Sequence, residues 1–286
     1  MKLKFITGLI VLFISVLSLE LKAQCNPPTG LRVLAYGPDF ITVDWNSTTA
    51  SSFQFRYITQ GGNISLATIN HSTSKPLTIS GLSPSTSYAL QVRELCTGAN
   101  PWPSFILDST SCSVVTPPFT AGFNGNAWSN GGFNSAGTIN SCWQRDAITG
   151  YIWKTGPQTF TSNFTGASPD RSGTGKYVQI DQISFPTNPS DSSDFISPLF
   201  DLSALTTPQL TFWYHMFGSD IETLKVYITN DYGVSYNLLQ TITGPQQFSN
   251  TDAWKESILS LSAYANDTVR LLFKSVEQTT GFQNAI

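Results

Sequence analysis

One stretch constrains the fold of this chain more than any other, residues 210–218 with the sequence LTFWYHMFG. It holds four aromatic side chains, a methionine and one of the two histidines of the chain. Bulky aromatics fit the pleated, half-buried surface of a sheet, so the stretch predicts a buried β-strand. We therefore expect Trp213 and His215 to stabilise a core rather than to contact a ligand.

Composition favours an all-β chain. Only 12% of the residues are charged and 13% are aromatic. The residues that build long helices are scarce, whereas Gly, Pro, Ser, Thr and Asn are abundant, which is typical of many short strands joined by turns. A length of 286 residues predicts about two domains.

The N-terminus reads as a secretory signal peptide. Lys2 and Lys4 precede an apolar run over 5–19, and Ala23 is a small residue at a cleavage point. The run is shorter than the roughly 20 residues that span a bilayer, which argues against the alternative of a membrane anchor. Cleavage after residue 23 would leave 12 basic and 17 acidic residues, a net charge of −5, and no basic patch. Nucleic acid and anionic membranes are therefore not expected partners.

Four cysteines, Cys25, Cys96, Cys112 and Cys142, follow the signal peptide. An even number in an exported chain predicts two disulfides. No two of them form a C-x-x-C pair, so a structural zinc site is not expected. Spacing alone leaves the three possible pairings open.

A Thr116-Pro117-Pro118 segment divides the exported chain, because two prolines cannot donate to a ladder. Before it, seven short stretches read as strands with turn residues between them, which predicts an antiparallel sandwich. These stretches are 31–36, 40–45, 53–59, 64–69, 77–79, 87–95 and 112–116.

Residues 25–117 resemble a fibronectin type III domain. The resemblance rests on Pro28-x-x-Leu31, on Trp45 and on Leu82-x-Pro84-x-Thr86-x-Tyr88. It implies a seven-stranded sandwich in which the hydroxyl of Tyr88 bonds to nearby backbone as a tyrosine corner. Trp102 lies between two prolines in the long loop 96–111, either exposed or folded back over that loop.

Residues 119–286 also read as strands, over 177–180, 210–216, 223–229, 257–261 and 268–274. Their short motifs are similar in order and spacing to a MAM domain and to the adhesin domains cut from large bacterial surface proteases, both jelly-roll sandwiches used in adhesion. The motifs are Phe123-Asn124, Cys142-Trp143-Gln144-Arg145, Trp153, DRSGTGKY at 170–177, ISPL at 196–199, the aromatic stretch, LKV at 224–226, Trp254 and 269–273.

These resemblances imply a cysteine pairing and an incomplete end. Similar bacterial chains pair a Cys just before the domain with one in the Cys-Trp motif, here Cys112–Cys142. The sandwich would place the other two cysteines at one pole, which gives Cys25–Cys96; the runner-up is Cys96–Cys112. The chain stops at Ile286 within the last strand of such a jelly roll, so we expect a C-terminally truncated domain in a fragment of a longer protein.

The sequence carries no catalytic set that we recognise. The SGTGK segment at 172–176 lacks the glycine and the Ser/Thr of a phosphate loop, and neither Gly-x-Ser-x-Gly nor His-Glu-x-x-His occurs. The nearest carboxylate pairs, Asp191/Asp194 and Asp220/Glu222, lie in polar sequence and read as solvated charges. We therefore predict that the chain is not an enzyme.

A structural Ca²⁺ is the one cofactor that the MAM resemblance implies. Its candidate ligands are Asn124, Asp170 and Ser172, because calcium prefers oxygen atoms. Asn124 stands where the family usually has an acid, and the family's terminal acid would lie beyond Ile286.

The leading hypothesis is an exported, non-catalytic adhesion protein, secreted or at the cell surface of a bacterium. Its jelly roll would bind an extracellular protein or glycan, with the fibronectin-like domain as a spacer. Exposed aromatics would make the contact, and Trp102, Trp128 and Tyr232 are the candidates. The alternatives are the targeting region of a larger secreted protease or glycosidase, and a purely structural stalk.

Overall fold

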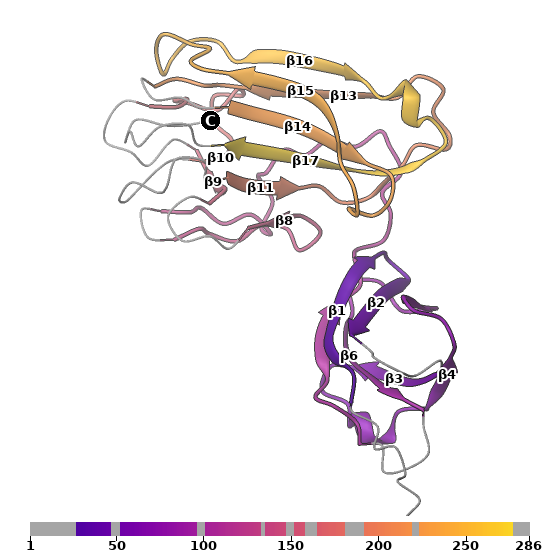
Figure 1. Cartoon of the computed structure of the whole chain (residues 1–286). Helices are drawn as coiled ribbons and strands as arrows, with labels where there is room; N and C mark the ends of the chain where they lie inside the picture. Colours follow the sequence, from indigo (N-terminus) through magenta and orange to yellow (C-terminus); the bar gives the residue numbers. More distant parts are fainter. Residues whose placement is uncertain are drawn as a thin grey trace, which may run out of the picture.

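A computed structural model describes residues 27–46, 52–95, 101–132, 135–146, 152–157, 165–180, 192–218 and 223–276. Within these ranges the chain is all-β, as predicted, with two short 3₁₀ turns, η1 (Ile64–Leu66) and η2 (Ser262–Tyr264). No helix in the described ranges is long and apolar enough to cross a membrane. Strands β1 to β7 form one sandwich and β8 to β17 a second, larger one (Figure 1).

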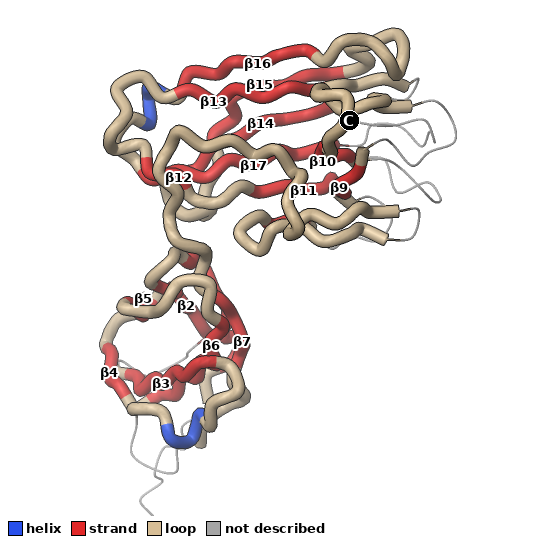
Figure 2. Tube along the Cα trace, turned by 180° about the vertical axis from the view of Figure 1, so that it is seen from behind, coloured by secondary structure: helices blue, strands red, loops and turns tan. Residues whose placement is uncertain are grey.

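Two sheets make up the first sandwich (Figure 2). Their order matches the fibronectin type III sandwich that the sequence resembles. The three-stranded sheet runs β1 (Thr29–Tyr36), β2 (Phe40–Asn46), β5 (Leu77–Ser80). The four-stranded sheet runs β4 (Asn70–Ser72), β3 (Phe53–Thr59), β6 (Ser87–Glu94), β7 (Ile106–Ser109).

Alternation along β2 builds the core of this sandwich. Ile41, Val43 and Trp45 point inward and are fully buried, as the period of two in a strand requires. Tyr88 is buried as well, and its hydroxyl accepts a hydrogen bond from the backbone N–H of Ser83 at 2.9 Å. This bond confirms the predicted tyrosine corner.

The second sandwich has a large sheet in the order β15-β14-β17-β11-β8, with β12 also paired to β17, and two small sheets, β13-β16 and β10-β9. Phe212 of β13 contacts Phe273 of β17 edge to face, with centroids 5.4 Å apart, which joins the layers. The strands are β8 (Gln144–Arg145), β9 (Lys154–Gly156), β10 (Tyr177–Gln179), β11 (Ser192–Ile196), β12 (Phe200–Asp201), β13 (Gln209–Tyr214), β14 (Thr223–Thr229), β15 (Asn237–Thr243), β16 (Lys255–Ser260) and β17 (Thr268–Val276).

The aromatic stretch does form a strand, but Trp213 points toward solvent, whereas we expected it to point into the core. Phe212 packs against the core, whereas Trp213 is 39% exposed on the outer face of β13. The prediction of a buried Trp213 is wrong, because neighbouring residues of a strand alternate between its faces and only one face of β13 is covered. His215 and Met216, just past the strand, are buried as predicted, at 2% and 0% exposed.

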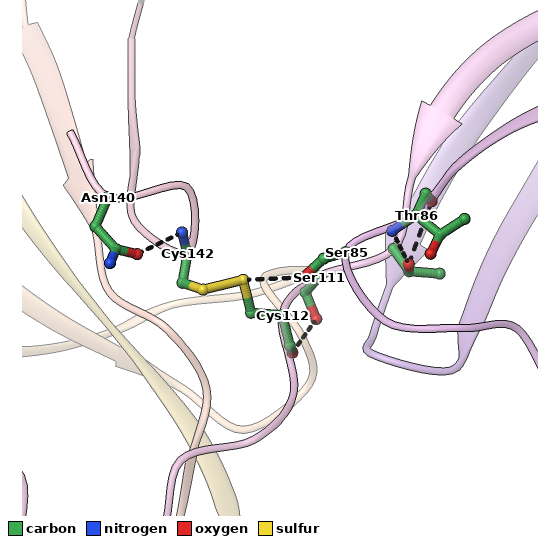
Figure 3. Close-up of a disulfide and its surroundings, with 7 residues drawn as sticks. Ser85, Thr86, Ser111, Cys112, Asn140 and Cys142 are labelled. Carbon is green, nitrogen blue, oxygen red and sulfur yellow. Dashed lines mark hydrogen bonds between the residues drawn. A yellow bond between two sulfur atoms is a disulfide. The ribbon is translucent and has the colours of Figure 1, made fainter. Parts of the chain in front are cut away.

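A disulfide connects the segment after β7 to the jelly roll. Cys112 is bonded to Cys142, with the two Cα atoms 5.4 Å apart (Figure 3), as the resemblance implied. This bond overturns the runner-up, Cys96–Cys112. Cys25 and Cys96 lie outside the described residues, so their pairing stays a prediction.

Backbone hydrogen bonds fix the same connecting segment on both sides. On the side of the first sandwich, the Ser111 N–H donates to the Gly37 carbonyl at 2.9 Å. On the other side, Val115 donates to Leu199 at 2.8 Å and accepts from Asp201 at 2.9 Å. The connection between the sandwiches is therefore an ordered segment rather than a free linker.

Side chains from the two sandwiches also meet directly, and we call this contact the domain joint. The Tyr36 hydroxyl donates to Gln144 Oε1 at 2.8 Å. The guanidinium of the buried Arg270 lies 5.5 Å from the centroid of the Tyr36 ring. Phe40 meets Tyr232 edge to face, with centroids 4.8 Å apart. Together with the disulfide, these contacts orient one sandwich on the other.

Candidate functional site

Trp102 packs on strands β3 and β6 of the first sandwich, so it is neither exposed nor folded over its own loop, the two arrangements that the sequence left open. Its indole is half-buried, and two guanidinium groups lie over the ring, Arg56 at 4.2 Å and Arg93 at 4.3 Å from the centroid. Gln91 binds both Arg56 Nε at 2.9 Å and the Pro103 carbonyl at 2.5 Å. Trp102 therefore anchors its loop on β3 and β6.

The other two predicted binding aromatics also contact the protein itself. Trp128 is 8% exposed, and Phe123 packs against it with ring centroids 5.0 Å apart, so its ring is not presented to solvent. Tyr232 contacts Phe40 in the domain joint. The structure therefore does not bring Trp102, Trp128 and Tyr232 together in one site.

The structure does bring the three predicted calcium ligands together, around Gly175. A Cβ atom at Gly175 would lie 2.6 Å from Asp170 Oδ2 and 3.0 Å from Asn124 Nδ2. Asp170 Oδ2 accepts from both the N–H and the hydroxyl of Ser172, at 3.1 and 2.8 Å. Asp170 Oδ1 accepts from the Gly175 N–H at 2.7 Å, and Asn124 Oδ1 from the Lys176 N–H at 2.7 Å.

This donor set fits calcium only in part. Calcium takes six to eight oxygen ligands, and Asp170 supplies the one carboxylate of the trio. No group of three or more His, Cys, Asp or Glu residues gathers in the described ranges. The turn over residues 170–175 is closed by its own hydrogen bonds, so these residues alone do not complete an ion site.

A cleft of about 320 Å³ lies beside this turn, between two loops and the outer face of β13. The sequence did not lead us to it. The first loop holds the cis Ser168-Pro169 bond, and the second precedes β16. The lining residues are Ser168, Pro169, Asp170, Arg171, Trp213, Asn250, Thr251, Asp252, Ala253 and Trp254.

Arg171 and the exposed Trp213 form one wall of the cleft. The guanidinium of Arg171 stacks 4.0 Å from the centroid of the Trp213 ring. Arg171 is exposed and makes no ion pair with a described carboxylate, so the edge of its guanidinium keeps hydrogen-bond donors for a ligand.

The opposite wall, residues 244–254, is held by a buried glutamine. Gln247 is 4% exposed, and its Oε1 accepts from the Met216 N–H at 2.7 Å. Its Nε2 donates to the Ala253 carbonyl at 3.2 Å. Asp252 closes the tip by accepting from the N–H groups of Phe248 and Ser249 at 2.7 and 3.0 Å. These bonds make the wall a preformed surface.

This rigid loop presents a phenylalanine to solvent. Phe248 is 96% exposed, although its own backbone is fixed by Asp252. It lies two residues before Asn250, the first residue of this loop that lines the cleft. A single exposed apolar ring is common on protein surfaces, so Phe248 bears on function only through its place next to the cleft.

Trp254 forms the floor of the cleft. Its indole N–H donates to the Pro169 carbonyl at 3.4 Å, which joins the two loops. Tyr177 and His215 pack against it, with ring centroids 5.1 and 5.6 Å away. Burial lowers the pKa of His215, although the Asp252 charge and the backbone of Ser249 and Asp252 favour the charged form. The Ser249 and Asp252 backbone groups lie close to the ring, but neither nitrogen of His215 makes a hydrogen bond of regular geometry with a described residue.

The two carboxyl groups of the cleft both have lowered pKa values. Burial raises the pKa of Asp170, but hydrogen bonds from Gly175, Ser172 and Gly173 outweigh it and lower the pKa. Hydrogen bonds from Ser249 and Phe248 lower the pKa of Asp252. Both carboxyls are therefore ionised at neutral pH, and neither has the raised pKa of a general acid.

Neither of the two carboxylate pairs named in the sequence analysis, Asp191/Asp194 and Asp220/Glu222, lies wholly within the described residues. Asp194 is held in an ion pair with Lys274 at 2.7 Å. Asp191, Asp220 and Glu222 lie outside the described residues.

A larger cavity of about 920 Å³ shares Asp170, Arg171, Trp213 and Trp254 with the cleft. Its other walls are mostly core side chains from both layers of the jelly roll. Among these are Trp143, Trp153, Phe195, Phe212 and Phe273. We therefore regard it as interior space of the sandwich, and the smaller cleft as the candidate site.

Comparison with protein families matches residues 130–286 to the family described as MAM domain, meprin/A5/mu. Solved structures similar to part of the chain include the following two. The FN5 domain of Drosophila Lar is 19% identical over 29% of this chain and 92% of its own, with a TM-score of 0.26. The fn3 domain of human contactin 1 is 18% identical over 42% of this chain and 100% of its own, with a TM-score of 0.30. At these scores the likeness adds nothing to the strand order described above.

Proposed function

Because the chain belongs to the MAM domain family, we propose that it is an adhesion-type protein whose jelly roll binds an extracellular partner at the Trp213 cleft. MAM and fibronectin type III domains are typically non-catalytic modules of extracellular proteins. The family does not name the partner. The role of the cleft is inferred from its own geometry.

One observation carries the proposal, the exposed aromatic and cationic surface on preformed loops. Trp213, stacked under Arg171, and the fully exposed Phe248 lie on segments that internal hydrogen bonds already fix. Ordered loops lose little entropy on binding, and desolvated aromatic and arginine side chains dominate interface energies.

The arrangement of the two domains supports a role as a displayed binder. The loop before β16 lies at the end of the jelly roll away from the first sandwich, whereas the turn between β14 and β15 lies beside it (Figures 1 and 2). The disulfide and the domain joint fix the first domain as a stiff arm. Such an arm would hold the cleft away from its point of attachment.

The test is a binding screen with the secreted chain against arrays of glycans and extracellular matrix proteins. We expect at least one specific ligand whose binding falls at least tenfold in Trp213→Ala. Leu238→Ala, which removes another exposed apolar side chain, at 54% exposure on β15, should bind like the wild type. A ligand that binds the Trp213 variant and the wild type equally would place the site elsewhere.

Export and calcium remain parts of this proposal. Residues 1–23 lie outside the described ranges. We propose that they direct secretion from a bacterial cell, so the N-terminal sequence of the secreted protein should begin at Gln24.

We also propose that a Ca²⁺ at Asn124, Asp170 and Ser172 would need ligands beyond these three. A thermal midpoint that is the same in calcium and in chelator would exclude that ion.

A further inference from the structure

We propose that the Trp213 cleft is a subsite for one neutral sugar unit of a glycan. This inference rests on the proposed function, since it names the chemistry of the ligand for the same cleft. A cleft of about 320 Å³ lies at the small end of ligand sites, which span roughly 300–1,000 Å³. It suits a single ring rather than an extended polymer segment.

The cleft offers both donors and acceptors in a small space, as a ligand rich in hydroxyls requires. The stacked guanidinium of Arg171 presents donors at its edge. The side-chain amide of Asn250 makes no hydrogen bond with a described residue, so it can both donate and accept. Asp252 Oδ1 accepts one bond, from the Ser249 hydroxyl at 2.6 Å, and keeps a lone pair.

Charge argues against an acidic ligand. Arg171 is the one cation among the described lining residues, and two ionised carboxylates, Asp170 and Asp252, line the same cleft. The local net charge is therefore −1, and the whole chain has a net charge of −3. A uronate or sialate would be repelled by this field, whereas an uncharged sugar would not.

Aromatic surface supplies the apolar half of the contact. The C–H face of a pyranose ring packs on an indole as other apolar surface does, and Trp213 keeps 39% of its surface in solvent. Phe248, almost fully exposed on the adjoining loop, offers a second ring for the next sugar of a chain.

A peptide is the less favoured occupant, because part of the backbone of the two loops is already paired. Extended peptides gain affinity from main-chain hydrogen bonds to a free edge. Here the Ser168 N–H donates to the Asn250 carbonyl at 2.8 Å, and the N–H groups of Phe248 and Ser249 donate to Asp252. The two loops thus offer side chains rather than an open ladder.

The experiment is ligand-observed NMR and calorimetry on the full secreted chain. The probes are neutral oligosaccharides of glucose, galactose and mannose, uronate and sialyl oligosaccharides, and acidic and neutral peptides. We expect a neutral sugar to bind, with at least a tenfold loss in Trp213→Ala. Arg171→Lys keeps the charge but loses the planar stack, so we expect a several-fold loss.

Phe105→Ala, which removes a 49% exposed aromatic from the first domain, is the matched control and should not change sugar binding. Every variant should remain folded at the assay temperature, and Trp213→Ala should have a lower thermal midpoint than the wild type, because most of its ring is covered.

Three results would overturn the inference. If only acidic sugars bind, the charge argument is wrong. If a peptide or protein binds through Trp213 and no sugar does, the sugar subsite fails while the proposed function stands. If no probe or array ligand depends on Trp213, both fail.

Discussion

At the scale of single residues, each side chain of the motif at 142–145 makes a contact that stabilises the fold. Cys142 forms the disulfide, and Trp143 stacks on Phe195 with centroids 4.8 Å apart. Gln144 accepts the hydrogen bond of the domain joint. Arg145 donates to the carbonyls of Ala136 and Trp153 at 2.7 and 2.9 Å, and burial lowers its pKa. All four side chains serve structure, so this motif of the resemblance does not itself mark a binding site.

His215 makes stability depend on pH at the same scale. Its folded pKa is below the ordinary 6.5, chiefly through burial. The unfolded chain therefore takes up the proton first, so the His215 contribution is fully present above about pH 6.5 and is lost as the pH falls through the folded pKa.

We expect the thermal midpoint to fall between pH 7 and pH 5, and this slope to flatten in His215→Leu. At pH 7.5 the variant should be as stable as the wild type or more stable, because a buried polar group without a partner is replaced by an apolar one. The exposed His71→Gln is the control and should keep the wild-type slope. An unchanged slope in His215→Leu would contradict this account.

At the scale of elements, the loop before β16 is ordered by one side chain. Gln247→Ala leaves the N–H of the buried Met216 without its partner and removes the bond to the Ala253 carbonyl. We expect a loss of about 1–3 kcal/mol and faster amide exchange over residues 246–254. The half-buried Gln246→Ala loses bonds to the Thr243 and Gly244 carbonyls at 3.1 and 3.3 Å and one from Lys255 at 3.3 Å, and it is the milder control because none of these holds a buried backbone group. Equal exchange in both variants would show that Gln247 does not order the loop.

At the scale of elements, the strands and the tyrosine corner could be predicted from the sequence, whereas the exposure of Trp213 and the cleft could not. Alternation and turn residues gave the sandwiches, and the spacing around Tyr88 predicted its corner, because these signals are local. The exposure of Trp213 was missed because a strand that is aromatic on both faces does not show which face is covered. The cleft was missed because Asp170 and Asn250 are far apart in sequence and meet only through the packing of two loops.

At the scale of the whole molecule, the turn around Asp231 positions one ring contact of the domain joint. Burial raises the pKa of Asp231, but hydrogen bonds from Ser235, Thr229 and Gly233 outweigh burial and bring the pKa down to about 2. These bonds shape the turn in which Tyr232, at a φ of 61°, reaches Phe40. Since the folded pKa lies below the ordinary 3.8, the stabilisation is present above pH 3.8 and is lost as the pH falls through about 2.

The orientation of the two domains should therefore persist down to about pH 4 and loosen between pH 4 and pH 2, as measured by small-angle scattering. In Asp231→Asn we expect the joint to be looser already at pH 6. A profile of the variant that overlays the wild type at pH 6 would show that another contact fixes the joint.

The disulfide Cys112–Cys142 decides whether the two domains act as one body. It closes a sequence separation of 30 residues, and its loss in Cys112→Ser/Cys142→Ser should cost about 2–4 kcal/mol. Both sandwiches keep their own cores, so we expect them to stay folded while the scattering profile broadens toward a range of interdomain angles. Cys25→Ser/Cys96→Ser removes the other predicted pair, which would close a bridge within the first domain, and should leave the interdomain angle unchanged. If the Cys112/Cys142 variant keeps the wild-type profile, the hydrogen bonds of residues 111–115 and the ring contacts hold the arm without the disulfide.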